Sequence, residues 1–194
     1  MKIYLVRHGE KENFIGDPAL TELGIKQARL TGEYFKSINI GYIFASPLKR
    51  TQMTASIIGK HLNLDFKIDD RLRERMNWGD RINQSFDDFL KEWNKGDLDR
   101  DYKPNNGDSS RETGNRFKNF LDEFDIKENI LVVTHGGTIG DFLRNNFEEK
   151  KLPMITTNNR YYVKITECSI TTLDKNKNSY ELLEVAKTEH LNEA

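Results

Sequence analysis

The stretch KIYLVRHG, residues 2–9, decides the fold, because an apolar run leads straight into Arg7, His8 and a glycine. A short run of this kind, without polar alternation, is typical of a strand buried on both faces of a parallel sheet. A second such run, NILVVTHGG at residues 129–137, ends in His135 followed by glycine. Since the carboxyl ends of parallel strands meet at one edge of a sheet, we expect His8 and His135 to lie close together.

Outside these two strands, further strands alternate with helical patterns. A third strand is predicted at 42–46, with Ser46 as the N-cap and Pro47 as the first position of the next helix. This order indicates an α/β fold, a three-layer sandwich with a mostly parallel central sheet flanked by helices. The spacing of apolar and turn residues predicts helices over 21–37, 47–62, 109–124 and 138–147, and two strands within 168–185 around the turn KNKN (175–178).

Length and composition bound the kind of protein. The 194 residues predict a single domain over 1–194, with a variable lid or substrate loop around 75–110. Within that loop, 94–109 is the least regular stretch, rich in Gly, Asn, Asp and Pro. The net charge of -1 excludes a general attraction to nucleic acid or to an anionic membrane.

The single cysteine and the short apolar runs exclude other classes. Cys168 is the only cysteine, so an internal disulfide and a cysteine-based zinc site are excluded. No apolar run is long enough for a signal peptide or a membrane span, and we therefore expect a cytoplasmic protein. The sequence leaves a homodimer open.

The residues at the predicted sheet edge favour chemistry on an anion. Arg7 carries a planar cationic fork that suits a carboxylate or a phosphate, and a glycine after each histidine lets the backbone approach a ligand. With no thiol and no serine elbow, the imidazole itself is indicated as the nucleophile, since its ordinary pKa of ~6.5 leaves it substantially neutral. Either histidine alone is more typical of a capping residue. A two-histidine metal site is the other alternative, but no carboxylate lies beside them at a ligand spacing, so we expect no metal.

Motifs along nearly the whole chain identify a family resemblance. The segments that carry it are LVRHGE (5–10), LTELGIKQA (20–28), ASPLKRTQMTA (45–55), RLRER (71–75), GDSSRETGNR (107–116), VVTHGGTIG (132–140) and the terminal HL (190–191). With these segments the sequence resembles the histidine phosphatase superfamily, which includes the cofactor-dependent phosphoglycerate mutases and their phosphatase relatives. It departs from the usual pattern at Lys11, where a small hydroxyl residue is common, at Asp108, which replaces glutamate, and after Gly79, where an aromatic-x-Gly is missing.

The resemblance implies catalytic roles for matching residues. His8 occupies the position of the nucleophile that forms a transient phosphohistidine, and Arg7, Arg50 and His135 occupy positions that bind the transferred phosphoryl group. Glu74 matches the carboxyl group that protonates the leaving oxygen and then deprotonates water.

Further residues are assigned with less specific motifs. Asn13 and Gly136 match substrate-binding positions, together with Arg7 and Arg50. Other candidates for the acid are Asp70, Asp80 and Asp108. Loop position alone suggests a variable wall whose cationic members would suit a second anionic group on the substrate: Lys11, Trp78, Arg81, Trp93, Arg100, Tyr102 and Lys103.

These observations leave three functions open. The first is a metal-independent phosphomonoester phosphatase that acts on a small phosphorylated metabolite without a cofactor. The second is a mutase of the phosphoglycerate mutase type, which has to enclose its phosphoenzyme away from water. The third is a non-catalytic phosphate-binding protein. The short middle loop favours the phosphatase, and the presence of every expected catalytic group ranks the binding protein last.

Overall fold

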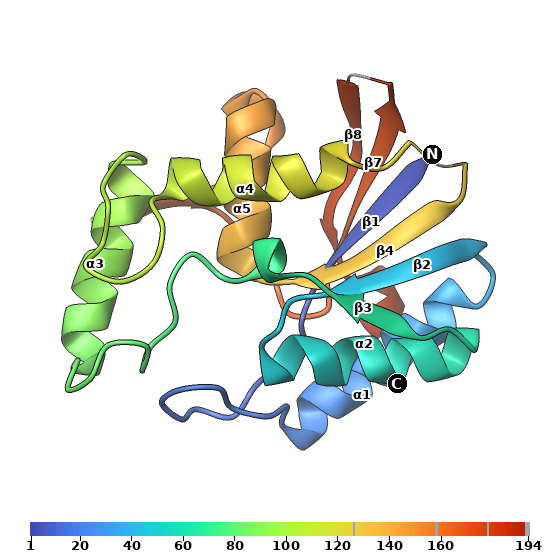
Figure 1. Cartoon of the computed structure of the whole chain (residues 1–194), viewed down its shortest axis with the longest axis horizontal. Coiled ribbons are helices and arrows are strands. Elements are labelled where there is room, and N and C mark those ends of the chain that lie inside the picture. The colour runs from blue at the N-terminus through green and yellow to red at the C-terminus, as the bar shows by residue number, and fades with distance from the viewer. Residues whose placement is uncertain (126, 158, 178, 193–194) are drawn as a thin grey trace.

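Strand β1 (Lys2–Arg7) lies inside a six-stranded sheet of order β3-β2-β4-β1-β7-β8 (Figure 1). Its neighbour β4 (Asn129–Thr134) runs parallel to it, and the register pairs Arg7 with Thr134. The two strands therefore end side by side, and the amide of His8 donates to the carbonyl of Thr134 at 3.0 Å. This pairing confirms the expectation that the two histidine motifs share one edge. The computed structural model describes residues 1–125, 127–157, 159–177 and 179–192.

The sheet is parallel over β3, β2, β4 and β1, and antiparallel from β1 through β7 to β8. A separate antiparallel hairpin is formed by β5 and β6. The remaining elements are β2 (Ile40–Ala45), β3 (Phe66–Ile68), β5 (Met154–Thr157), β6 (Arg160–Val163), β7 (Ile170–Asn176), β8 (Ser179–Lys187), α1 (Glu22–Phe35), α2 (Lys49–Leu62), α3 (Phe86–Leu98), α4 (Ser110–Asp122), α5 (Gly136–Asn146) and short 3-10 turns at Asp70–Leu72, Glu149–Lys151 and Glu189–Leu191.

Helices cover both faces of the sheet, as Figure 1 shows. Ile3 and Leu5 of β1 belong to the core cluster that includes the phenylalanines of α4 and α5. Tyr4 and Val6 belong to the second cluster, which includes Phe35 of α1 and the apolar face of α2. Since successive side chains of a strand point to opposite faces, β1 is buried on both sides. The α/β three-layer sandwich is confirmed.

Three predicted boundaries are wrong. Helix α2 begins at Lys49 with Leu48 as its N-cap, because Pro47 lies outside the helix and the hydroxyl of Ser46 is drawn to a histidine instead. Helix α5 begins at Gly136, two residues before the predicted start at 138. Residues 94–98, assigned to an irregular stretch, continue helix α3.

Helix α3 is not predicted from the sequence. It lies apart from the six-stranded sheet, at the far left of Figure 1. It packs mainly against β6.

The two strands predicted within 168–185 are β7 and β8, and residue 178 of the turn between them lies outside the described residues. Among the described helices, none has the length and apolar character needed to cross a bilayer.

Candidate active site

His8 follows the carboxyl end of β1, and its hydrogen bonds fix its tautomer. Its Nδ1 lies 2.7 Å from the carbonyl oxygen of Gly9, and its Nε2 lies 3.2 Å from Nε of Arg50. A guanidinium nitrogen can only donate and a carbonyl oxygen can only accept. The proton of the neutral ring therefore sits on Nδ1, and Nε2 presents its lone pair.

The surroundings of His8 keep the ring neutral. The side chain is 4% exposed. Burial, followed by the positive charges of Arg50 and Arg7, holds the pKa of His8 well below its ordinary value. An imidazole that stays unprotonated at neutral pH can attack an electrophile without a separate base.

Two arginines bracket this ring. Arg7 donates from Nη1 to the carbonyl of Ile165 at 2.6 Å and forms an ion pair with Glu167. Arg50 is 3% exposed and lies 3.7 Å from a carboxylate oxygen of Asp17. Nε of Arg7 and Nη1 of Arg50 are buried and have no hydrogen-bond partner among the residues that the structure describes. Both nitrogens can therefore donate to a bound anion.

His135 follows β4 directly and is the N-cap of α5. It adds a second imidazole to the edge of the sheet where His8 lies. Its ring centroid lies 5.3 Å from that of His8. Its Nε2 is 2.8 Å from Oγ of Ser46, while its buried Nδ1 has no partner within the described part of the chain. Burial and then the charge of Arg50 lower the pKa of His135 well below its ordinary value. When Ser46 donates to Nε2, Nδ1 carries the proton and can donate to a ligand.

Glu74 lies against the N-terminus of α5. Its carboxylate accepts the amide of Gly137 at 3.1 Å and the amide of Thr138 at 2.9 Å, and the Thr138 hydroxyl donates to it at 3.2 Å. The amide of Arg75 also donates to it, at 2.9 Å. Free amides at a helix N-terminus favour a negative charge. These donors hold the Glu74 carboxylate in one position, near the edge of the sheet where His8 and His135 lie.

One cavity of about 500 Å³ connects these groups. Of the residues predicted from the sequence, the cavity is lined by Arg7, His8, Asn13, Arg50, Glu74 and Gly136. His135 reaches the site through its contact with His8 and is itself buried. The structure thus brings the predicted catalytic and substrate-binding residues to one place.

The other candidates for the acid lie elsewhere. Asp70, Asp80 and Asp108 are absent from the described residues that line the cavity. Asp108 instead pairs with Arg116 at 2.9 Å, and Asp80 accepts from Asn77 at 3.2 Å. Glu74 is therefore the one carboxyl group of that set which faces the same space as His8.

The suggested variable wall is only partly correct. Lys11, Trp78 and Trp93 line the cavity. Arg81, Arg100, Tyr102 and Lys103 do not, because other groups hold the cations: Arg81 pairs with Glu92 at 3.0 Å, Lys103 pairs with Glu112 at 2.7 Å and Arg100 donates to main-chain carbonyls of α5.

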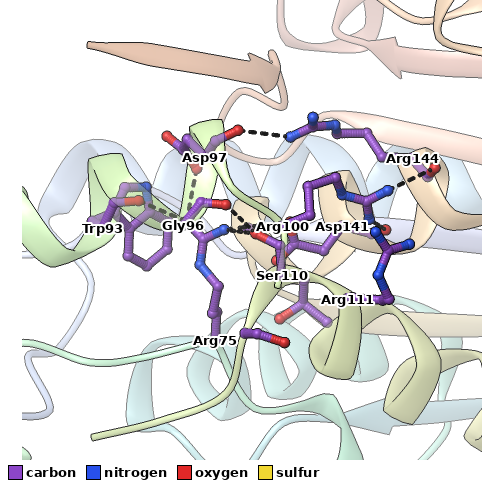
Figure 2. Close-up of polar contacts among 12 residues, drawn as sticks. Arg75, Trp93, Gly96, Asp97, Arg100, Ser110, Arg111, Asp141 and Arg144 are labelled. Atoms are coloured by element: carbon purple, nitrogen blue, oxygen red, sulfur yellow. Dashed lines mark hydrogen bonds and ion pairs between the residues drawn. The ribbon is translucent and has the colours of Figure 1, made fainter. Parts of the chain in front are cut away.

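Sequence reasoning missed a buried charge cluster at the cavity (Figure 2). Arg75 pairs with Asp97 at 2.7 Å and with Asp141 at 3.4 Å, and Arg160 pairs with Asp97 at 2.8 Å. Asp141 is 4% exposed. Burial, together with the negative charges of Glu74 and Asp97, raises the pKa of Asp141 to about 7. These effects outweigh the positive charge of Arg75, which lowers the pKa.

A signal for Asp141 was present in the sequence. Residues four apart lie on one face of a helix, so Asp141 follows Gly137 on the face of α5 that turns to the cavity. Nothing comparable marks Asp97, because its two ion-pair partners, Arg75 and Arg160, come from two distant segments of the chain.

Comparisons with known proteins identify the family over most of the chain. The sequence model of the histidine phosphatase superfamily (branch 1) matches residues 3–188. A curated relative, the probable phosphoglycerate mutase GpmB of Yersinia pestis, is 34% identical over 158 residues, which span 74% of this chain and 73% of that protein.

Solved structures share the fold over almost the full length. A mycobacterial glucosyl-3-phosphoglycerate phosphatase in complex with inorganic phosphate superimposes with a TM-score of 0.73 at 22% identity, covering 97% of this chain and 98% of that chain. Phosphoserine phosphatase from Entamoeba histolytica in complex with 3-phosphoglyceric acid gives a TM-score of 0.70 at 24% identity, covering 98% of each chain. At such identities these matches establish a common fold.

Proposed function

Because the chain belongs to the histidine phosphatase superfamily, we propose that it is a metal-independent phosphomonoester phosphatase that works through a phosphohistidine at His8. The observation that carries the proposal is the fixed tautomer of His8, whose Nε2 lone pair is held by Arg50 Nε at 3.2 Å. The substrate class is a small phosphorylated metabolite. Two of the structural relatives are phosphatases by name, which supports hydrolysis.

The first step transfers the phosphoryl group to the enzyme. The Nε2 lone pair of His8 forms a bond to phosphorus while the bond from phosphorus to the ester oxygen breaks. Arg50 exchanges its contact with His8 for a phosphoryl oxygen, and the unpartnered nitrogens of Arg7, Arg50 and His135 donate to the same oxygens. Donors that are already in place stabilise the charge of the transition state without having to reorganise.

Glu74 carries the protons in both steps. Its carboxyl group gives a proton to the leaving oxygen, so the product alcohol departs neutral. The resulting carboxylate then takes a proton from water, whose oxygen attacks phosphorus while the bond to His8 Nε2 breaks. Inorganic phosphate leaves, and His8 is neutral again. The amides of Gly137 and Thr138 hold the carboxylate in position for the second step.

The test is an assay on the purified chain treated with a strong chelator, with phosphomonoesters followed by phosphorus NMR. We expect free phosphate from one or more esters, together with acid-labile phosphate trapped on the protein. Loss of all turnover with the chelator, and its return with a divalent ion, would contradict the metal-independent mechanism. Among the described residues, no group of three or more His, Cys, Asp or Glu is arranged to hold a metal ion.

A mutase is the second candidate, and the name of the GpmB relative favours it. The same assay separates the two activities, with 3-phosphoglycerate as the substrate. Conversion to 2-phosphoglycerate without release of phosphate identifies a mutase, whereas release of phosphate identifies a phosphatase. We also propose a cytoplasmic location, to be tested by cell fractionation; the single buried thiol of Cys168 is compatible with a reducing compartment.

A further inference from the structure

Helix α3 turns its apolar stripe toward the cavity instead of toward the core. Phe86, Phe89, Leu90 and Trp93 recur at the spacing of one helix face, and all four line the cavity. An amphipathic helix ordinarily buries this stripe against the protein interior. Here Phe86 remains 44% exposed. The fold therefore leaves apolar surface open next to the phosphoryl site.

The exposed stripe is a continuous aromatic wall. The ring centroids of Trp78 and Phe86 are 4.8 Å apart, those of Phe86 and Phe89 are 6.2 Å apart, and those of Phe89 and Trp93 are 5.8 Å apart. The hairpin strand β6 adds Tyr162, against whose ring the guanidinium of Arg160 lies at 3.9 Å. Flat apolar faces thus reach the cavity from two separate elements.

The wall meets the catalytic groups at Gly137. A Cβ atom added to Gly137 would lie 2.5 Å from Oε1 of Glu74 and 2.9 Å from the ring of Trp93. The proton donor and the aromatic wall therefore touch the same point of α5. Since the leaving oxygen departs opposite the nucleophile, the alcohol that receives the Glu74 proton passes along Trp93.

Two of the arginines that line the cavity are already paired with carboxylates. Arg160 is paired with Asp97 at 2.8 Å, and Arg144 is paired with Glu149 at 3.0 Å. Asp141 adds a further carboxyl group to the lining. At the phosphoryl end Arg7 pairs with Glu167 and Arg50 lies 3.7 Å from Asp17. Lys11 and Lys164 also line the cavity, and neither has a carboxylate partner among the residues that the structure describes.

From the wall and its junction with Glu74, we infer that the substrates are phosphomonoesters of alcohols that carry an aromatic ring, and that the ring lies against Trp78, Phe89 and Trp93. This inference rests on the proposed phosphatase function and names its substrate class. A cavity of about 500 Å³ has room for a ring besides the phosphoryl group, since pockets of roughly 300–1,000 Å³ hold drug-sized ligands.

The test compares esters of primary alcohols, so that leaving-group acidity stays nearly constant. We expect kcat/KM for 2-phenylethyl phosphate to exceed that for ethyl phosphate by at least about tenfold, and to exceed that for 2-cyclohexylethyl phosphate, because flat rings add stacking to apolar burial. Equal values for the phenyl and ethyl esters, equal values for the phenyl and cyclohexyl esters, or a preference for 3-phosphoglycerate would each overturn the inference.

A matched pair of variants locates the preference. Phe89→Leu keeps apolar volume but removes a ring, so the ratio of kcat/KM for the phenyl ester over the ethyl ester should fall about threefold or more. Leu98→Ala is the control, since Leu98 lies on the same helix, is 58% exposed and is not part of the lining. A ratio that Phe89→Leu leaves unchanged, or that Leu98→Ala lowers equally, contradicts the assignment of the wall.

Binding separates this inference from the proposed function. Trp78 and Trp93 are the only two tryptophans of the chain, so their fluorescence reports directly on the wall. 2-Phenylethylphosphonate, which is not hydrolysed, should bind at least about tenfold more tightly than ethylphosphonate and change this fluorescence. Preferential binding without any turnover of the esters would refute the phosphatase and keep the aromatic site. Turnover without preferential binding would do the reverse.

Discussion

At the scale of single residues, the site depends on which nitrogen of His8 carries the proton. Its Nδ1–H is used by the carbonyl of Gly9, so Nε2 is available as a nucleophile. His8→Ala should therefore abolish turnover and leave no acid-labile phosphate on the protein, while its circular dichroism spectrum stays that of the wild type. Trapping of phosphate on this variant would show that another side chain is the nucleophile.

Glu74 gives a second prediction at this scale. Glu74→Gln removes the proton donor but keeps one carbonyl oxygen for the amides of α5, so the chain should still fold. We expect kcat to fall by about 10²–10⁴ for alkyl phosphates. The fall should be much smaller for the first turnover of 4-nitrophenyl phosphate, whose leaving group needs no proton.

Rapid-quench measurement of the burst distinguishes these steps. In Glu74→Gln the phosphohistidine should accumulate with 4-nitrophenyl phosphate, because water activation also needs the carboxylate. An equal loss for alkyl and nitrophenyl esters in the first turnover would assign the proton transfer to a different group.

At the scale of secondary-structure elements, close backbone contact joins α1 to the loop after His8. A Cβ atom on Gly24 would lie 2.0 Å from the carbonyl oxygen of Glu10. Gly24→Ala should therefore push this loop away and destabilise the protein by about 1–3 kcal/mol, with a fall in kcat/KM. Gly96→Ala on α3 is the control, since its nearest neighbour is 3.6 Å away, and it should be neutral or stabilising by up to ~1 kcal/mol. Urea denaturation of both variants measures the difference, and equal effects would refute it.

An element could be predicted where its pattern of apolar residues reflects the packing around it, and could not be predicted where the pattern does not. The run from Ile3 to Val6 is apolar at every position because both faces of β1 are covered, and that made its place in the sheet evident. The stripe on α3 shows the ordinary helical spacing, yet it covers a cavity. Periodicity records that a face is apolar and carries no information about what lies opposite.

The start of α2 shows the same limit for polar residues. Ser46 and Pro47 form a common helix start, but the hydroxyl of Ser46 is 2.8 Å from His135, which is 89 residues further along the chain. A local rule for helix caps does not include a partner so distant in sequence. The sheet edge that carries His8 and His135 could be predicted from its motifs, whereas Arg75 and Asp97 lie 22 residues apart and no sequence pattern marks them as a pair.

At the scale of the whole molecule, buried ionisable groups link folding to pH. The pKa of His8 and of His135 is lowered in the folded state, mainly by burial. Above the unfolded value of ~6.5 both states are neutral, and as pH falls below it the unfolded chain takes up protons that the folded chain does not. The free energy of unfolding should therefore decrease on acidification, by up to about 1.4 kcal/mol per pH unit for each histidine.

Asp141 changes the free energy of unfolding with pH in the opposite direction. Its pKa is raised to about 7, so its contribution to stability is fully present below ~3.8 and is lost as pH rises through about 7. Urea denaturation between pH 7.5 and 5 should show a shallower slope for His8→Ala than for the wild type. Asp141→Asn should show a steeper one, since the opposing group is gone. Parallel curves for all three proteins would contradict these shifts.

The order of strands in the sheet has a consequence for synthesis of the protein. The partners of Ile3 in the sheet are Ile130 on one side and Leu173 on the other. While the ribosome makes the chain, β1 emerges before both of its partners and stays unpaired until β4 and then β7 have been made. His8 is thus translated long before Thr134, whose carbonyl accepts its amide in the folded protein. A nascent chain that stops before β4 contains His8 but has no active site.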